Sequence, residues 1–104
     1  MEWVYSKDAA NGTVLALRAK DLGSRIFNIT MASLTQPQDM ANALQQVVPG
    51  ARVKIETPQA TAVSLPNMSG VSDQSISRKV LGYAPKYDLV AGLRDLADWM
   101  KARG

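Results

Sequence analysis

The stretch from residue 73 to residue 99 constrains the fold most, because it combines helix starts, a helix stop and a helical apolar stripe. Asp73 is expected to cap a short helix, and Gly82 to end it, because glycine tolerates the positive φ of a C-cap. Pro85 prevents that helix from continuing. Asp88 is the next expected N-cap, and the apolar residues behind it recur at the helical period: Leu89, Leu93, Leu96 and Met100.

Trp99 lies beside this stripe and is the expected anchor of the C-terminal helix. We predict that its ring is buried against the turn formed by Leu81 and Tyr83. Asp95 and Asp98 are expected on the solvated side of the same helix. We do not interpret them as an acid/base pair, because no carboxylate on a strand faces them. The stretch therefore predicts two helices that meet through one aromatic side chain.

Two further helices are expected upstream. Asp8 is expected to cap a helix that runs to about Lys20, although Gly12 lowers its intrinsic stability by about 1 kcal/mol relative to alanine. Tertiary packing must therefore hold this helix. Thr35 opens a capping-box pattern, and the helix behind it ends before Pro49.

Three segments have the composition of strands. Residues 2–5 and 25–30 are rich in β-branched and aromatic side chains, and residues 52–56 alternate apolar with charged side chains. Residues 58–71 leave two interpretations open, an extended edge or a loop. The prediction is a single α/β domain over residues 1–104, with a small sheet of three strands or fewer and three to four helices.

The composition excludes several classes of site. The 104 residues contain no histidine and no cysteine, so the commonest general base, the commonest metal ligands and disulfides are absent. The net charge of +3 comes from scattered lysines and arginines without interleaved aromatic residues, which argues against nucleic-acid binding. No apolar run approaches the roughly 18 residues of a membrane span. We expect a cytoplasmic protein without a metal, nucleic-acid or membrane partner.

Three groups of residues occur in the order found in a known protein family. Residues 73–85 read Asp-x-Ser, five further residues and Leu-Gly-Tyr-x-Pro, and a leucine-rich helix ending in tryptophan follows. Residues 3–10 place a short strand before an aspartate-led helix, and residues 25–29 contain Phe-Asn-Ile. Over essentially its whole length the chain resembles the C-terminal portion of the NAD-dependent epimerase/dehydratase family, the extended short-chain dehydrogenases. The resemblance implies a partial, substrate-side lobe that lacks the dinucleotide-binding domain.

The catalytic and cofactor motifs of that family are missing. Its Gly-x-x-Gly-x-x-Gly turn, which holds the pyrophosphate, has no counterpart among the isolated glycines of this chain. Its Tyr-x-x-x-Lys pair is also absent, because Tyr83 and Lys86 are one residue too close and are separated by Pro85. Where the family has an arginine for the substrate diphosphate, residues 69–71 read Ser-Gly-Val. We therefore predict no catalytic residue, no cofactor-binding residue and no useful affinity for NAD(H) or NADP(H).

Asn28 is the residue that the resemblance places on the substrate side. It follows the aromatic Phe27 of the expected strand, as in the family pattern. Its side chain either points toward a substrate cleft or holds a neighbouring loop through hydrogen bonds to the backbone. We favour the second interpretation.

The resemblance implies a segment without redox activity of its own and leaves three functions open. The chain is one half of a split enzyme with a separate nucleotide-binding chain, or an oligomeric binding module, or a silent remnant or excised piece. We predict a symmetric dimer, because the strand at 26–29 and the helices around 14–17 and 40–47 lose the sheet on which they pack in the family. In the alternative, residues 58–71 fold over the exposed edge and the chain is a monomer.

Overall fold

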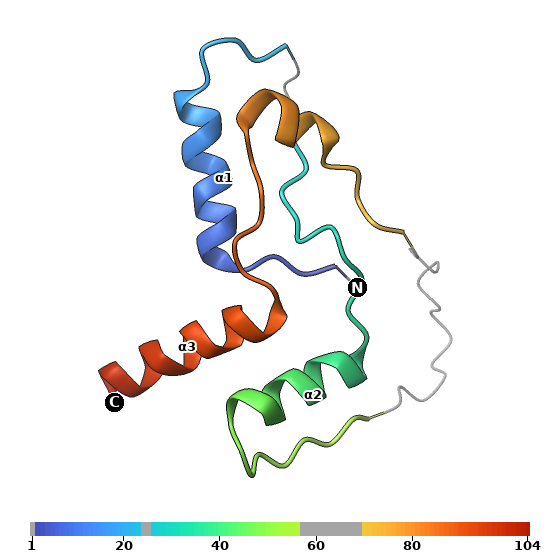
Figure 1. The fold of residues 1–104 in the computed structure, drawn as a ribbon, viewed down its shortest axis with the longest axis vertical. Helices are drawn as coiled ribbons and strands as arrows, with labels where there is room; N and C mark the ends of the chain where they lie inside the picture. Colours follow the sequence, from blue (N-terminus) through green and yellow to red (C-terminus); the bar gives the residue numbers. More distant parts are fainter. Residues whose placement is uncertain (1, 24–25, 57–69) are drawn as a thin grey trace.

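The computed structural model describes residues 2–23, 26–56 and 70–104, and about half of these residues are helical. In chain order the elements are helix α1 (Ser6–Arg18), helix α2 (Pro37–Val47), the short π-helical turn η1 (Ser77–Leu81) and helix α3 (Leu89–Arg103) (Figure 1). The three α-helices lie within about one turn of the positions that caps and apolar spacing predict.

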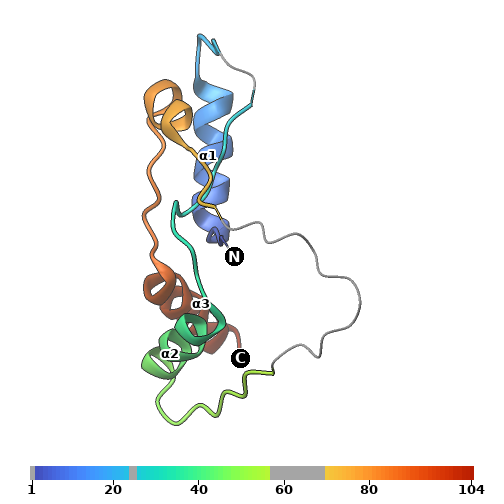
Figure 2. The ribbon, with the colours of Figure 1, turned by 90° about the vertical axis from the view of Figure 1, so that its right-hand side faces the viewer.

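The helical elements form two pairs. Helix α1 packs beside η1 and helix α2 packs beside α3, while no other two helices of the described ranges approach each other closely through their backbones (Figures 1 and 2). Residues 26–36, which bend at Ala32 (φ 53°), and residues 82–88 are non-helical connections that run from one pair to the other (Figure 1). The Cα atoms occupy a slab of 48 × 42 × 18 Å. The molecule therefore has an α1–η1 half and an α2–α3 half.

No β-strand occurs in the described part of the chain, so the predicted α/β fold with a small sheet is wrong. Glu2 forms an isolated antiparallel bridge with Leu34. Residues 26–30 and 51–56 are extended, but no neighbouring strand pairs with them among the described residues. The physical reason is that β-propensity favours extended backbone, whereas a strand also needs a second segment that supplies a ladder of hydrogen bonds.

Few apolar side chains of the described residues are buried. The buried ones are Ala41, Ala43, Leu81 and Tyr83. Fourteen large apolar side chains in the same part of the chain are exposed, from Val4 at 38% to Leu17 at 81%. Domains normally bury such side chains between packed layers of secondary structure. Here much of the apolar surface has no layer over it.

Asp8 has a different role from the predicted N-cap. Helix α1 begins at Ser6 with Tyr5 as its N-cap, so Asp8 is already inside the helix. Its carboxylate is 1% exposed and accepts hydrogen bonds from the backbone N–H groups of Lys86 (2.9 Å) and Tyr87 (3.0 Å). The capping prediction is wrong because these oxygens hold the connection to α3 rather than the first turn of α1.

Gly12 shows why α1 tolerates a glycine. It is buried, and a Cβ atom at this position would lie 2.9 Å from two side-chain carbons of Ile29. Any side chain on residue 12 would therefore collide with the extended segment 26–30. The close approach of Ile29 supplies the tertiary packing that the sequence requires for this helix.

In the C-terminal third, the residues predicted to begin and end helices lie in turns and connections. Asp73 accepts the N–H of Ser75 at 2.8 Å in the turn that leads into η1. Gly82 follows η1 as its C-cap with φ of 67°, and half-buried Pro85 lies in the extended connection after it. Asp88 is the N-cap of α3 and accepts the N–H three residues further on at 2.8 Å, as predicted.

Trp99 is not buried, and the predicted contact with the turn at 81–83 is wrong. Its side chain is 54% exposed, and the guanidinium carbon of Arg103 lies 4.7 Å from the ring centroid. The extended connection 82–88 carries α3 away from η1, so the two elements do not touch (Figure 1). Sequence spacing placed Trp99 on a helix but gave no information on the direction of that connection.

Candidate functional site

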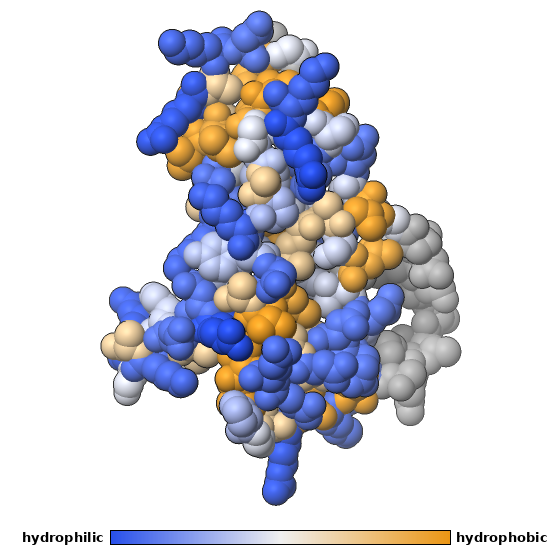
Figure 3. All heavy atoms as spheres, in the orientation of Figure 1, coloured by the Kyte–Doolittle hydropathy of each residue, from blue (hydrophilic) through white to orange (hydrophobic). Residues whose placement is uncertain are grey.

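Two adjoining hollows lie on the α2–α3 half and share the side chains of Trp3 and Met40. The larger, of about 410 Å³, is bounded by α2 and residues 53–56. The smaller, of about 230 Å³, is bounded by the leucine stripe of α3 and residues 3–5. Apolar surface covers the junction between α2 and α3 on the face seen in Figure 3. A mostly apolar hollow with a few polar groups is the usual form of a binding site.

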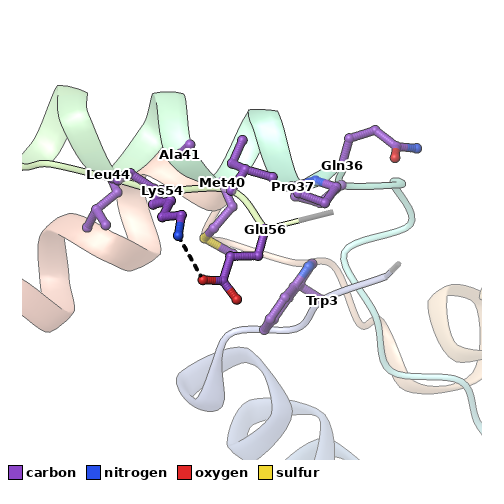
Figure 4. A pocket seen from close by; sticks show the side chains of 11 residues that line it. Trp3, Gln36, Pro37, Met40, Ala41, Leu44, Lys54 and Glu56 are labelled. Carbon is purple, nitrogen blue, oxygen red and sulfur yellow. Dashed lines mark ion pairs between the residues drawn. The ribbon is translucent and has the colours of Figure 1, made fainter. Parts of the chain in front are cut away.

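The larger hollow combines apolar side chains with one ion pair (Figure 4). Met40 comes from α2, and Trp3 lies across from it on the N-terminal segment. The Lys54 ammonium lies 3.2 Å from a carboxylate oxygen of Glu56, with both side chains largely exposed. Because an exposed ion pair contributes little free energy, the apolar side chains dominate what this hollow offers to a partner.

The ring of Tyr5 forms a wall of the smaller hollow. It lies against α3 at Gly92, where a Cβ atom would be 3.1 Å from the ring. On its other side it contacts the ring of Tyr87, with 4.8 Å between centroids and 48° between planes. Apolar residues from one face of α3 complete this part of the lining: Leu89, Leu93 and Leu96.

A charged cluster joins this wall to α3. The Tyr5 hydroxyl donates to Asp95 Oδ2 at 2.6 Å, and Lys7 Nζ lies 2.7 Å from the same oxygen. These contacts lower the pKa of Asp95, with Lys7 the larger cause, and raise the pKa values of Tyr5 and Lys7. The prediction that Asp95 lies on a solvated face is wrong, since it is half-buried. No local signal could have revealed this role, because Tyr5 is 90 residues away in the sequence.

Asn28 lies in the α1–η1 half, away from both hollows. Its side-chain amide donates to the Asp73 carbonyl at 2.7 Å, and its own carbonyl accepts the Ser77 hydroxyl at 2.7 Å. In this geometry the side chain joins the extended segment 26–30 to the turn before η1. The site residues expected from the sequence therefore do not converge on one cleft.

Tyr83 is placed for structure rather than for proton transfer. It is 1% exposed, and its hydroxyl donates to the Thr30 carbonyl at 3.0 Å. Burial raises the pKa of Tyr83, which makes the phenol a poorer proton donor than an exposed tyrosine. Among the described residues no group of three potential ligands of the His, Cys, Asp and Glu types is arranged to hold a metal ion. Likewise, none of the helices in the described ranges has the length and apolar character required to cross a bilayer.

Comparison of the chain with protein-family models, with curated proteins and with solved structures gives no match. The resemblance to epimerases and dehydratases thus remains a prediction from sequence motifs. The geometry of the apolar hollows and of the extended segments is the independent basis for a functional proposal.

Proposed function

We propose that this chain is a substrate-side, C-terminal segment of the epimerase/dehydratase type that has no redox activity of its own and acts by binding a second polypeptide. The supporting observation is the open apolar surface of the two adjoining hollows, whose lining includes the exposed side chains of Trp3, Ile55 and Leu96. Burial of apolar surface contributes about 25 cal/mol per Å². Soluble monomers rarely leave a large contiguous apolar patch bare. We infer that another protein surface covers it.

The backbone of residues 27–30 supports the same proposal. Alternate residues of an extended segment direct their backbone groups to opposite edges. The carbonyls of Asn28 and Thr30 accept hydrogen bonds from side chains of the η1 region. The backbone groups of Phe27 and Ile29 face the other edge and have no hydrogen-bond partner in the described part of the chain. A strand from another chain supplies such partners by β-sheet pairing.

A second copy of the chain is the first candidate partner. Two copies that bury the same surface form an isologous two-fold interface, which is the commonest arrangement of identical chains. The motifs support a second candidate, a separate nucleotide-binding chain, because this sequence has neither the glycine-rich turn nor Tyr-x-x-x-Lys. In that arrangement the chain is one half of a split enzyme.

Size-calibrated light scattering at tens of micromolar tests the dimer. We expect twice the chain mass of 11.2 kDa, with dissociation on dilution. Met40→Glu introduces a charge into both hollows and is expected to shift the protein to monomer. Gln45→Glu is the matched control, because it introduces the same charge at an exposed position of the same helix. A mass of 11.2 kDa at every concentration contradicts the dimer.

A second experiment separates the two partners. The chain is mixed with an epimerase/dehydratase from which the C-terminal segment has been deleted, and association is followed by light scattering. A mixed complex supports the split enzyme, whereas a chain that associates neither with itself nor with this protein contradicts the proposed function. Titration of the chain alone with NADH is expected to leave the cofactor fluorescence unchanged. A micromolar dissociation constant in that titration contradicts the absence of a cofactor site.

A further inference from the structure

We propose that Asp95 is a positioning residue that holds the Tyr5 ring as a wall of the smaller hollow and thereby sets the shape of the apolar surface on the α2–α3 half. The significance of this role rests on the proposed function, since that surface is the one we expect a partner to cover. The contacts of Asp95 are a property of the isolated chain. The role of Asp95 and the proposed function can therefore be tested separately.

The contacts at Asp95 place two side chains on one oxygen atom. The Tyr5 hydroxyl and the Lys7 ammonium both lie within 2.7 Å of Oδ2, and the carboxylate is half-buried. Hydrogen bonds to a charged acceptor are about twice as strong as those between neutral groups. The contact with Lys7, followed by that with Tyr5, lowers the pKa of Asp95, so the carboxylate stays in the charged form, the better acceptor for Tyr5, to a lower pH.

The Tyr5 ring packs across α3 at Gly92, where the helix has no side chain. Residues three apart lie on the same face of a helix, so Gly92 and Asp95 are neighbours along the surface of α3. The Tyr5 ring lies on Gly92, and its hydroxyl reaches Asp95 one turn further on. The ring of Tyr87 restricts it from another side. Gly92 leaves room for the Tyr5 ring against α3, and the Asp95 carboxylate orients the ring by accepting its hydroxyl.

The cluster is also the polar link between α1 and α3. These two helices are not in contact through their backbones, and within the described residues their hydrogen bonds and ion pairs meet at Asp95. Tyr5 and Lys7 belong to the start of α1, where Tyr5 is the N-cap. Asp8, the next residue, holds the connection at Lys86. The start of α1 therefore determines both the path of the connection and the position of α3.

Titration of the tyrosines tests the contact between Asp95 and Tyr5. The chain is labelled with ¹³Cζ-tyrosine, and the three tyrosines are followed by NMR as the pH is raised. Asp95→Asn is expected to shift the Tyr5 titration to lower pH, because the charged acceptor raises its pKa. Lys7→Gln is expected to shift it to higher pH, because the ammonium lowers it. Opposite shifts show that both charged groups lie beside the Tyr5 hydroxyl in solution, whereas an Asp95 that does not contact Tyr5 leaves this titration unchanged. Asp98→Asn, an exposed carboxylate on the same helix, is the matched control.

Trp3 gives the second measurement, because it lines the same hollow. In a Trp99→Phe background the tryptophan fluorescence comes from Trp3 alone, which lies where the two hollows adjoin. Asp95→Asn and Tyr5→Phe are both expected to increase acrylamide quenching of Trp3, since each releases the ring, whereas Asp98→Asn leaves it unchanged. Tyr5→Phe keeps the aromatic ring and removes the hydroxyl, so it tests the proposal even when Asp95→Asn fails to fold.

The proposal is overturned when the Tyr5 titration is the same in Asp95→Asn and Asp98→Asn, or when Tyr5→Phe leaves the quenching of Trp3 unchanged. Both measurements use the isolated chain below the concentration at which it associates. A chain without any partner can therefore still show the Asp95 effect. Conversely, a stable dimer with no Asp95 effect supports the proposed function and contradicts this inference.

Discussion

The two halves of the molecule are held together by different interactions. In the α1–η1 half, Gly12 and Leu81 are buried together with polar side chains that bind backbone groups far away in the sequence: Asp8 on the 82–88 connection, and Ser77 and Tyr83 on the extended segment 26–30. In the α2–α3 half, the buried positions of the helices are small residues, namely Ala41, Ala43 and Gly92. Large apolar side chains there line open hollows.

This difference indicates which interactions hold each half in place within the chain. A buried polar group must find a hydrogen-bond partner, and in the α1–η1 half each one finds it within the chain. Apolar burial has no such directional requirement, so another chain can supply the missing surface as well as this chain can. We therefore expect substitutions of the buried polar side chains in the α1–η1 half to change folding stability, and substitutions of the side chains that line the hollows of the α2–α3 half to change association.

The largest expected effect is that of Asp8→Ala. It removes the buried acceptor of the partly buried N–H groups of Lys86 and Tyr87, and the loss of a partner for a buried polar group costs about 1–3 kcal/mol. We expect the free energy of unfolding to fall by about 3 kcal/mol in urea denaturation. Asp21→Ala, at an exposed position, is the control. Equal denaturation midpoints for the two variants would show that Asp8 is not a tie between the halves.

The glycines inside α1 and α3 test the difference between the two halves. Gly12→Ala places a Cβ atom 2.9 Å from Ile29, which packs closely against α1 at this point, so we expect a loss of about 1–3 kcal/mol despite the better helix propensity of alanine. Gly92→Ala meets the Tyr5 ring at 3.1 Å beside an open hollow, where a small shift of the ring relieves the contact. We expect its stability to stay within about 1 kcal/mol of the original, because the gain in helix propensity offsets the shift. Calorimetric melting of both variants measures the difference, and a reversed order contradicts the assignment of the halves.

Trp99→Ala is expected to have a small effect. The ring is 54% exposed and interacts with Arg103, a contact worth about 0.5–1 kcal/mol at exposed sites. Burial of the ring, as the sequence suggested, would instead make the substitution cost about 3–5 kcal/mol. Chemical denaturation separates these values. A loss in the higher range would place Trp99 in a packed environment.

Lowering the pH is expected to reduce the free energy of unfolding gradually. The Ser72 hydroxyl lowers the pKa of Glu2, and Lys7, followed by Tyr5, lowers the pKa of Asp95. A carboxylate whose pKa is lower in the folded state stabilises the fold above its ordinary pKa near 4, and this contribution is lost as the pH falls through the folded value. Urea midpoints measured from pH 6 to pH 2 should therefore decline below about pH 4. The decline should be shallower in Asp95→Asn, and an identical pH dependence contradicts the Asp95 contacts.

The positions of the helices were determined by the sequence alone, because their signals are local. Asp88 caps α3, and the leucine stripe behind it forms one face of the helix along the smaller hollow. Gly82 provides the positive φ that ends η1. Each of these features involves residues within a few positions of one another, so their physical causes can be read directly along the chain.

Only the tertiary structure decided how these elements meet. Residues 26–30 have the composition of a strand, yet the described part of the chain contains no second strand to pair with them. Asp8 and Asp95 were interpreted as a cap and a solvated side chain, but their oxygens bind groups that lie 78 to 90 residues away. Trp99 was expected to be buried, and an extended connection carries it into solvent. Spacing and composition specify local backbone conformation, whereas hydrogen bonds and burial between distant segments depend on where the connections lead in space.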